Sequence, residues 1–97
     1  MGKLGEFLEF KELVKKLTER TLREEYLEHK EYRSKDFHCD HKLSIKESFE
    51  QGVPPDMVAH ICNLQITDAT YNLKKGSKSS ITFEELLEEI TLREEYL

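Results

Sequence analysis

The hydrophobic period of this chain changes from that of a helix to that of a strand near Phe37, and this change limits the folds that it can adopt. Residues 3–17 carry apolar side chains mostly at helical spacing, which predicts an amphipathic helix. From residue 37 to 45 apolar and polar residues alternate, which predicts a half-buried strand. A chain of 97 residues that holds both patterns is expected to form one compact α+β domain.

The alternation assigns the residues of this strand to two faces. One face holds Phe37, Cys39, His41, Leu43 and Ile45, and the other holds His38, Asp40, Lys42 and Ser44. An ideal pleat therefore sends the neighbours Asp40 and His41 to opposite faces. Both can reach one site only at a strand end or a bulge.

Capping signals predict the remaining helices. Thr21 and Glu24 have capping-box spacing, so a second helix, or a continuation of the first, is expected toward Glu31. Thr82 and Glu85 have the same spacing and predict a final helix. This last helix is expected to run to the end of the chain.

Between these helices, turn residues mark the connections. The stretch EQGVPPD at 50–56 predicts a loop in which Pro55 opens a short helical turn. Residues 60–66 are expected to form a second strand or an extended lead into a helix. A helix over 69–75 is expected to begin at Thr67 or Asp68 and to stop at Gly76.

The net charge of −5 is unevenly distributed along the chain. Residues 83–97 carry one Lys or Arg against six Asp or Glu, whereas residues 32–82 carry seven against six. The middle also holds the basic cluster KKGSK at 74–78. This distribution excludes a strongly basic nucleic-acid binder and leaves a locally basic one.

The composition gives no membrane or secretion signal. No apolar run approaches about 18 residues, and the start MGKLGEFLEF lacks the apolar segment of a signal peptide. We therefore expect an intracellular protein without a membrane segment, in which Cys39 and Cys62 stay reduced.

Four polar residues lie along the middle of the chain in a recognisable order: Asp40 and His41, then Asn63, then Asn72 nine residues later. Together with SIKESF, VPP, HICNLQ and YNLKKG, this order resembles the HNH endonucleases, the ββα-metal nuclease family, and in particular its phage-type members with homing or recombination activity. The resemblance spans about residues 37–81. It implies a core of two short antiparallel strands and a helix at 35–81, flanked by helical segments at 1–34 and 82–97.

Phosphodiester hydrolysis needs a base for the attacking water and positive charge beside the leaving oxygen. A neutral imidazole suits the first task, so His41 is the candidate base. Asp40 and Asn72 offer the oxygen ligands that Mg²⁺ prefers, and Mn²⁺ or another divalent cation can substitute. The resemblance assigns Asn63 to bracing the loop and orienting the catalytic histidine. It implies hydrolysis of DNA to 5′-phosphate and 3′-hydroxyl ends.

Three lysines near Asn72, namely Lys74, Lys75 and Lys78, are candidates for contacts with DNA phosphates.

The sequence departs from the family pattern in two ways. Asn72 stands where the family name has its second histidine, which makes the expected metal site richer in oxygen. The interval of 22 residues between His41 and Asn63 is longer than a hairpin requires, so residues 46–58 are expected to form an excursion between the strands.

Two other interpretations remain open. Cys39, His41, His60 and Cys62 are soft or borderline ligands that are able, in principle, to hold Zn²⁺ across two segments, although their spacing is unlike that of the usual zinc motifs. Alternatively, the chain is a catalytically degenerate HNH-like module whose acidic C-terminal helix binds a protein partner.

One heptapeptide, TLREEYL, occurs at 21–27 and again at 91–97. A helix that packs into one groove can pack twice, so the repeat is compatible with a homodimer or a helix-swapped assembly. It is equally compatible with a duplication that has no role. No third copy exists, which excludes a solenoid.

Overall fold

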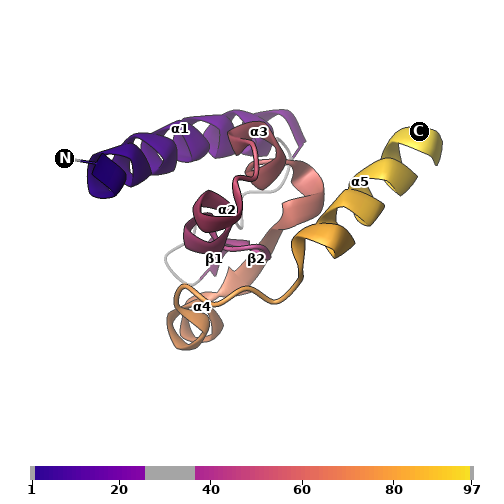
Figure 1. Ribbon diagram of the computed structural model, residues 1–97. Coiled ribbons are helices and arrows are strands. Elements are labelled where there is room, and N and C mark those ends of the chain that lie inside the picture. The colour runs from indigo at the N-terminus through magenta and orange to yellow at the C-terminus, as the bar shows by residue number, and fades with distance from the viewer. Residues whose placement is uncertain (1, 26–36, 97) are drawn as a thin grey trace.

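The structure, a computed structural model that describes residues 2–25 and 37–96, confirms the predicted α+β class (Figure 1). The predicted helical continuation over residues 26–31, the boundary at 34 and 35, and Leu97 lie outside the described residues. The elements in chain order are α1 (Gly2–Glu25), β1 (Phe37–His41), α2 (Ile45–Gln51), α3 (Pro55–Val58), the 3-10 helix η2 (Ile61–Asn63), β2 (Leu64–Asp68), α4 (Ala69–Lys75) and α5 (Phe83–Tyr96).

Helix α1 continues without a break through Thr21, where the sequence allows either a second helix or a continuation of the first. The Thr21 hydroxyl donates to the Leu17 carbonyl (3.0 Å), a bond made inside a helix rather than at its start. The capping-box interpretation of Thr21 and Glu24 is therefore wrong, and the first helix continues. Thr18 lies within the helix and is buried, with 6% of its surface exposed.

Strands β1 and β2 form a two-stranded antiparallel sheet, with Phe37 opposite Asp68 and His41 opposite Leu64. The first strand ends at His41, so the prediction that it reaches residue 45 is wrong. The expected division into an apolar and a polar face is also wrong, because Asp40 is only 4% exposed. Helix α4 packs against both strands and covers the side to which Asp40 points.

The excursion between the strands is helical. Helix α2, which the alternation at 37–45 concealed, begins after Ser44, whose side chain accepts from the Glu47 amide (3.1 Å). It ends at Gly52, which has a φ of 72° and adopts the left-handed conformation that favours glycine. The predicted helical turn at Pro55 is confirmed as α3.

The predictions for the second half of the chain are mostly confirmed. The second strand is shifted from the predicted residues 60–66, because residues 61–63 form η2 and β2 covers Leu64–Asp68. Asp68 caps α4 by accepting from the Tyr71 amide (2.8 Å), and Gly76 ends it as predicted. At the start of α5 the reciprocal capping box is present, because the Thr82 hydroxyl and the Glu85 carboxylate each accept from the other residue's amide (both 3.1 Å).

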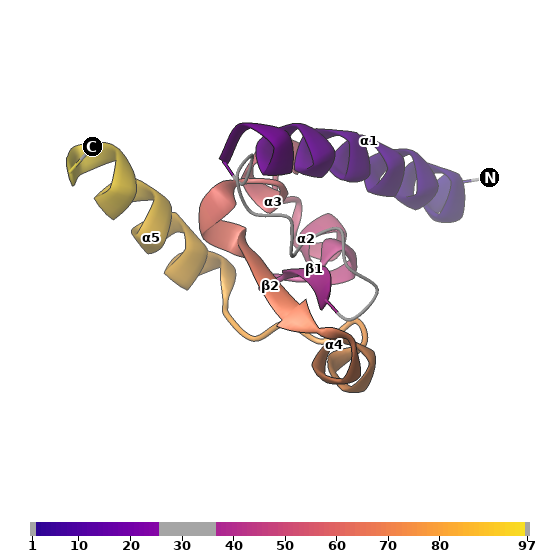
Figure 2. The ribbon, with the colours of Figure 1, turned by 180° about the vertical axis from the view of Figure 1, so that it is seen from behind.

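Figures 1 and 2 show α1 and α4 toward opposite ends of the molecule, with the sheet, α2 and α3 between them and α5 to one side. The core consists of buried apolar residues from α1, α3, α5 and the loops before and after α2: Val14, Leu43, Val53, Val58, Leu86 and Ile90. Among the described residues, no helix is long and apolar enough to cross a membrane.

Candidate active site

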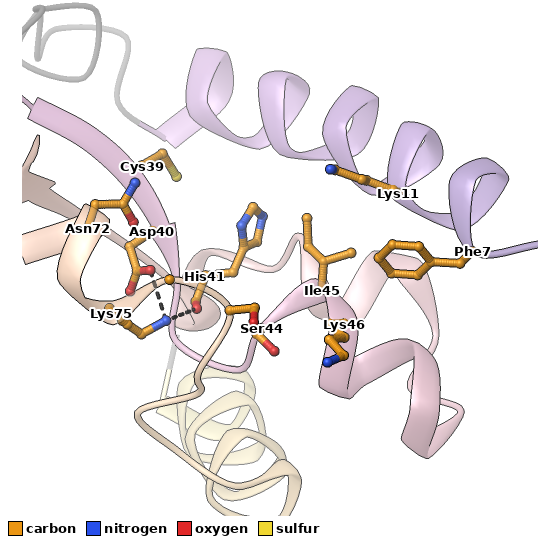
Figure 3. A pocket seen from close by; sticks show the side chains of 12 residues that line it. Phe7, Lys11, Cys39, Asp40, His41, Ser44, Ile45, Lys46, Asn72 and Lys75 are labelled. Carbon is orange, nitrogen blue, oxygen red and sulfur yellow. Dashed lines mark hydrogen bonds and ion pairs between the residues drawn. The ribbon is translucent and has the colours of Figure 1, made fainter. Parts of the chain in front are cut away.

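Asp40 and His41 line one pocket of about 410 Å³, which the structure places where β1 ends. Helices α1, α2 and α4 and the loop after α4 complete its walls (Figure 3). The polar side chains that line it are Lys11, Asp40, His41, Ser44, Lys46, Asn72, Lys75 and Ser77. Three lysines and one aspartate thus make the pocket basic on a chain whose net charge is −5.

Asp40 and His41 reach this pocket from different directions. In Figure 3 the His41 ring points toward α1, whereas the Asp40 carboxylate points toward Lys75. The register of the two strands is regular up to His41, without a bulge. The strand end, rather than a bulge, is therefore what allows the two neighbours to share the pocket.

Both carboxylate oxygens of Asp40 have partners. Lys75 Nζ lies 2.9 Å from Oδ1, and the Gln65 amide donates to Oδ2 (2.8 Å). Lys75 Nζ also donates to the His41 carbonyl (3.0 Å). This ion pair is buried, since the side chains of Lys75 and Asp40 are 7% and 4% exposed.

The His41 imidazole is held by α1. Its Nε2 lies 2.9 Å from the Thr18 hydroxyl, which is buried. Burial lowers the pKa of His41 to about 4, with Asp40 opposing the shift and Lys75 adding to it. The ring is therefore neutral, and able to accept a proton, throughout the physiological pH range.

Asn63 is fully buried and connects three segments of backbone. Its Oδ1 accepts from the Leu43 amide (2.7 Å), and its Nδ2 donates to the carbonyls of Leu43 (3.1 Å) and Val58 (2.8 Å). These bonds fix the chain two residues after His41 and tie it to the end of α3. The bracing role that the family resemblance implies for Asn63 requires contacts of this kind.

Asn72 lies on the side of β1 that carries Asp40, and Figure 3 shows the two side chains next to each other. The Asn72 Nδ2 donates to His38 Nδ1 (3.0 Å). No sequence pattern predicts a role for His38. In the structure it orients the Asn72 amide, so that the amide oxygen is the atom left for another ligand.

The three lysines expected to contact phosphates differ in their surroundings. Lys74 and Lys78 are exposed, in α4 and in the loop that follows it. Lys75 is instead buried against Asp40. Two further lysines, Lys11 and Lys46, line the pocket and had no sequence motif to mark them, because each belongs to the charged face of an ordinary helix.

Of the four residues of the zinc interpretation, Cys39 and His41 line the pocket, whereas His60 and Cys62 do not. Cys39 and His41 lie in β1, whereas Cys62 lies against α5, with Sγ 3.7 Å from the Glu89 carbonyl. In the part of the chain that the structure describes, no three His, Cys, Asp or Glu side chains are close enough together to hold a metal ion. Burial, together with Asp40, raises the pKa of the Cys39 thiol to about 12, which keeps it protonated.

The residues near Asp40 fit a hard cation better. Lys75 Nζ lies between a carboxylate oxygen of Asp40 and the His41 carbonyl, so two oxygens at this point already surround a positive charge. The Asp40 carboxylate and the Asn72 amide are oxygen donors, which Mg²⁺ and Mn²⁺ prefer over thiolate.

Comparison of the chain with models of protein families, with curated proteins and with solved structures finds no match.

Proposed function

We propose that this protein is a metal-dependent DNA endonuclease that hydrolyses phosphodiester bonds in the pocket beside Asp40 and His41. The observation that carries this proposal is that a histidine, a carboxylate and an amide line one basic pocket of an acidic protein. In this proposal β1, β2 and α4 correspond to the ββα-metal core of the HNH endonucleases. The protein would then act inside the cell, on DNA.

His41 is the base that takes a proton from the attacking water. Because Thr18 is hydrogen-bonded to Nε2, the proton would go to Nδ1. This assignment requires Nε2 to carry the ring proton and Thr18 to accept it. The low pKa of His41 favours an available lone pair, although it makes the ring a weaker base than an exposed histidine.

Asp40 and Asn72 would hold Mg²⁺ or Mn²⁺, which supplies positive charge to the scissile phosphate and the leaving 3′-oxygen. Asn63 keeps the backbone after His41 in place through its three buried hydrogen bonds. Lys11 and Lys46 line the same pocket and attract phosphates, with Lys74 and Lys78 exposed nearby on the α4 side.

A plasmid-nicking assay tests this function. Supercoiled DNA is incubated with the wild-type protein in Mg²⁺, in Mn²⁺ or in EDTA, and with His41→Ala. His60→Ala is the matched control, because His60 is a half-buried histidine outside the pocket. We expect metal-dependent nicking that falls by about 100-fold or more in His41→Ala and persists in His60→Ala. No nicking by the wild type across metals and DNA forms would refute the proposal.

One observation favours a second candidate, a non-enzymatic interaction module. Both oxygens of Asp40 already have partners within the protein, as expected of a carboxylate that serves stability alone. The acidic helix α5 also exposes Leu87 (39%) and Leu92 (48%), apolar side chains of the kind that bind a protein partner. In that case His41→Ala keeps the full biological effect of the protein.

A further inference from the structure

The contact between Lys75 and Asp40 is an unusual feature of the pocket. The Lys75 ammonium makes two short contacts, to Asp40 Oδ1 (2.9 Å) and to the His41 carbonyl (3.0 Å), and its side chain is 7% exposed. Lysine is almost never buried to this extent unless it is paired, because its ammonium is strongly hydrated in water. Its position therefore depends on these two oxygens.

Asp40 consequently has two candidate cations. One is Lys75, which the chain itself supplies at the last position of α4. The other is the divalent cation that Asp40 and Asn72 would share. Two cations at one buried carboxylate repel each other strongly, so the binding of one opposes the binding of the other.

We propose that Lys75 is a tethered cation, which neutralises Asp40 while no divalent cation is bound and gives up this carboxylate when one binds. This inference rests on the proposed metal site. Lys75 lines the pocket that would receive the DNA, so an ammonium displaced from Asp40 remains beside the phosphates. The exchange keeps Asp40 paired with positive charge at every stage, which a buried carboxylate requires.

As a tethered cation, Lys75 has different partners in the metal-free and the metal-bound protein. In the metal-free protein it stabilises the buried end of β1 through Asp40 and the His41 carbonyl. In the metal-bound protein it contacts phosphate, as the sequence predicts for this lysine. While Lys75 occupies Asp40, the site cannot bind metal. The apparent affinity for metal is therefore the intrinsic affinity multiplied by the fraction of time that Asp40 is free of Lys75.

Metal binding without DNA tests this inference, because it does not depend on catalysis. Free Mn²⁺ is titrated against the wild-type protein, Lys75→Met and Lys75→Gln, and the bound fraction is measured by electron paramagnetic resonance. Lys74→Met is the matched control, since it removes the same charge from the exposed neighbouring position of α4. Asp40→Asn reports whether the binding is at this carboxylate.

We expect Lys75→Met and Lys75→Gln to bind Mn²⁺ about tenfold more tightly than the wild type, whereas Lys74→Met changes the affinity by less than about threefold. Lys75→Gln retains an amide that can donate to the same oxygens, so it is the variant to use if Lys75→Met does not fold. The inference would be overturned if the Lys75 variants bind Mn²⁺ no more tightly than the wild type. It would also be overturned if their tighter binding persists when Asp40→Asn is added to the same protein.

The test separates this inference from the proposed function. If the wild type nicks no DNA but the Lys75 variants gain Mn²⁺ affinity at Asp40, the tethered cation stands and the endonuclease function falls. If the wild type nicks DNA and the Lys75 variants bind Mn²⁺ no better than Lys74→Met, the endonuclease function stands and the tethered cation falls.

Discussion

At the scale of single residues, the fully buried Asn63 fixes the backbone around the candidate site. Asn63→Ala would leave the Leu43 amide and the carbonyls of Leu43 and Val58 without these partners, away from water. We expect it to lower the free energy of unfolding by about 3 kcal/mol or more. Urea unfolding followed by circular dichroism measures this loss.

Asn72→Ala is the matched control for that experiment. The Asn72 side chain is half-buried and donates to His38 alone among the described residues, so we expect a loss of about 1 kcal/mol. Equal losses for the two variants would show that Asn63 does not have the structural role derived from its contacts.

Thr18 positions His41 from outside the region of family resemblance. Thr18→Val keeps the shape of the side chain and removes the oxygen that lies 2.9 Å from His41 Nε2. We expect cleavage to fall by about tenfold, because a base that loses its orienting partner spends less time in productive geometry. Thr18→Ser, which keeps the hydroxyl, is expected to cleave nearly as fast as the wild type in the same nicking assay. A Thr18→Val protein as active as Thr18→Ser would contradict the positioning role.

The sequence marks some of these residues better than others. Asp40, His41, Asn63 and Asn72 are marked by their order and spacing. Their partners Thr18, Gln65 and Lys75 lie 23 to 35 residues away from the groups that they contact. No local pattern marks Thr18 or Gln65, and the basic cluster that holds Lys75 predicts a phosphate contact rather than the ion pair with Asp40. Which lysine of the pair Lys74 and Lys75 turns inward is decided by how α4 packs on the sheet.

At the scale of elements, the start of α5 is defined by a reciprocal capping box. Thr82→Ala removes the acceptor for the Glu85 amide (3.1 Å) and is expected to cost about 1 kcal/mol of unfolding free energy. Thr91→Ala is the control, because Thr91 is exposed within the same helix. Thermal melts of both variants measure the effect. Equal shifts of the melting temperature would argue against the cap as its source.

Capping-box spacing predicts a helix start only where no helix is already in progress. Thr82 follows a polar loop and caps α5, whereas Thr21 lies where the apolar phase of α1 continues from Val14 to Leu22. The same spacing at Ser44 and Glu47 marks the start of α2. The alternation of the preceding strand, which Leu43 and Ile45 continue, masks that signal in the sequence.

The repeated heptapeptide has two different surroundings. Leu22 of the first copy is buried (8% exposed), whereas Leu92 of the second is exposed (48%). An exposed ion pair, from Arg93 Nη2 to Glu25 Oε2 (3.4 Å), joins the two copies. Identical sequence therefore does not give identical packing, and a dimer or helix swap through this segment stays a prediction.

At the scale of the whole molecule, an acidic protein presents a basic pocket. Lys11→Ala and Lys46→Ala each remove one positive charge from its lining, so each is expected to weaken DNA binding and to reduce the dependence of log Kd on log salt by about 1. Fluorescence anisotropy with labelled DNA in EDTA measures both quantities. Lys15→Ala, at an exposed position of α1 outside the pocket, is the control. If it weakens binding as much as the pocket variants, DNA binds elsewhere.

In the proposed function, the His41 imidazole is the base of a metal-dependent DNA cleavage. Single-turnover cleavage of labelled duplex DNA in Mn²⁺, by the wild type and by His41→Gly with and without added imidazole, tests it most directly. We predict that the wild type cleaves, that His41→Gly is about 100-fold slower or more, and that imidazole restores part of the rate. Equal rates for the two proteins, or no cleavage by the wild type, would contradict the claim.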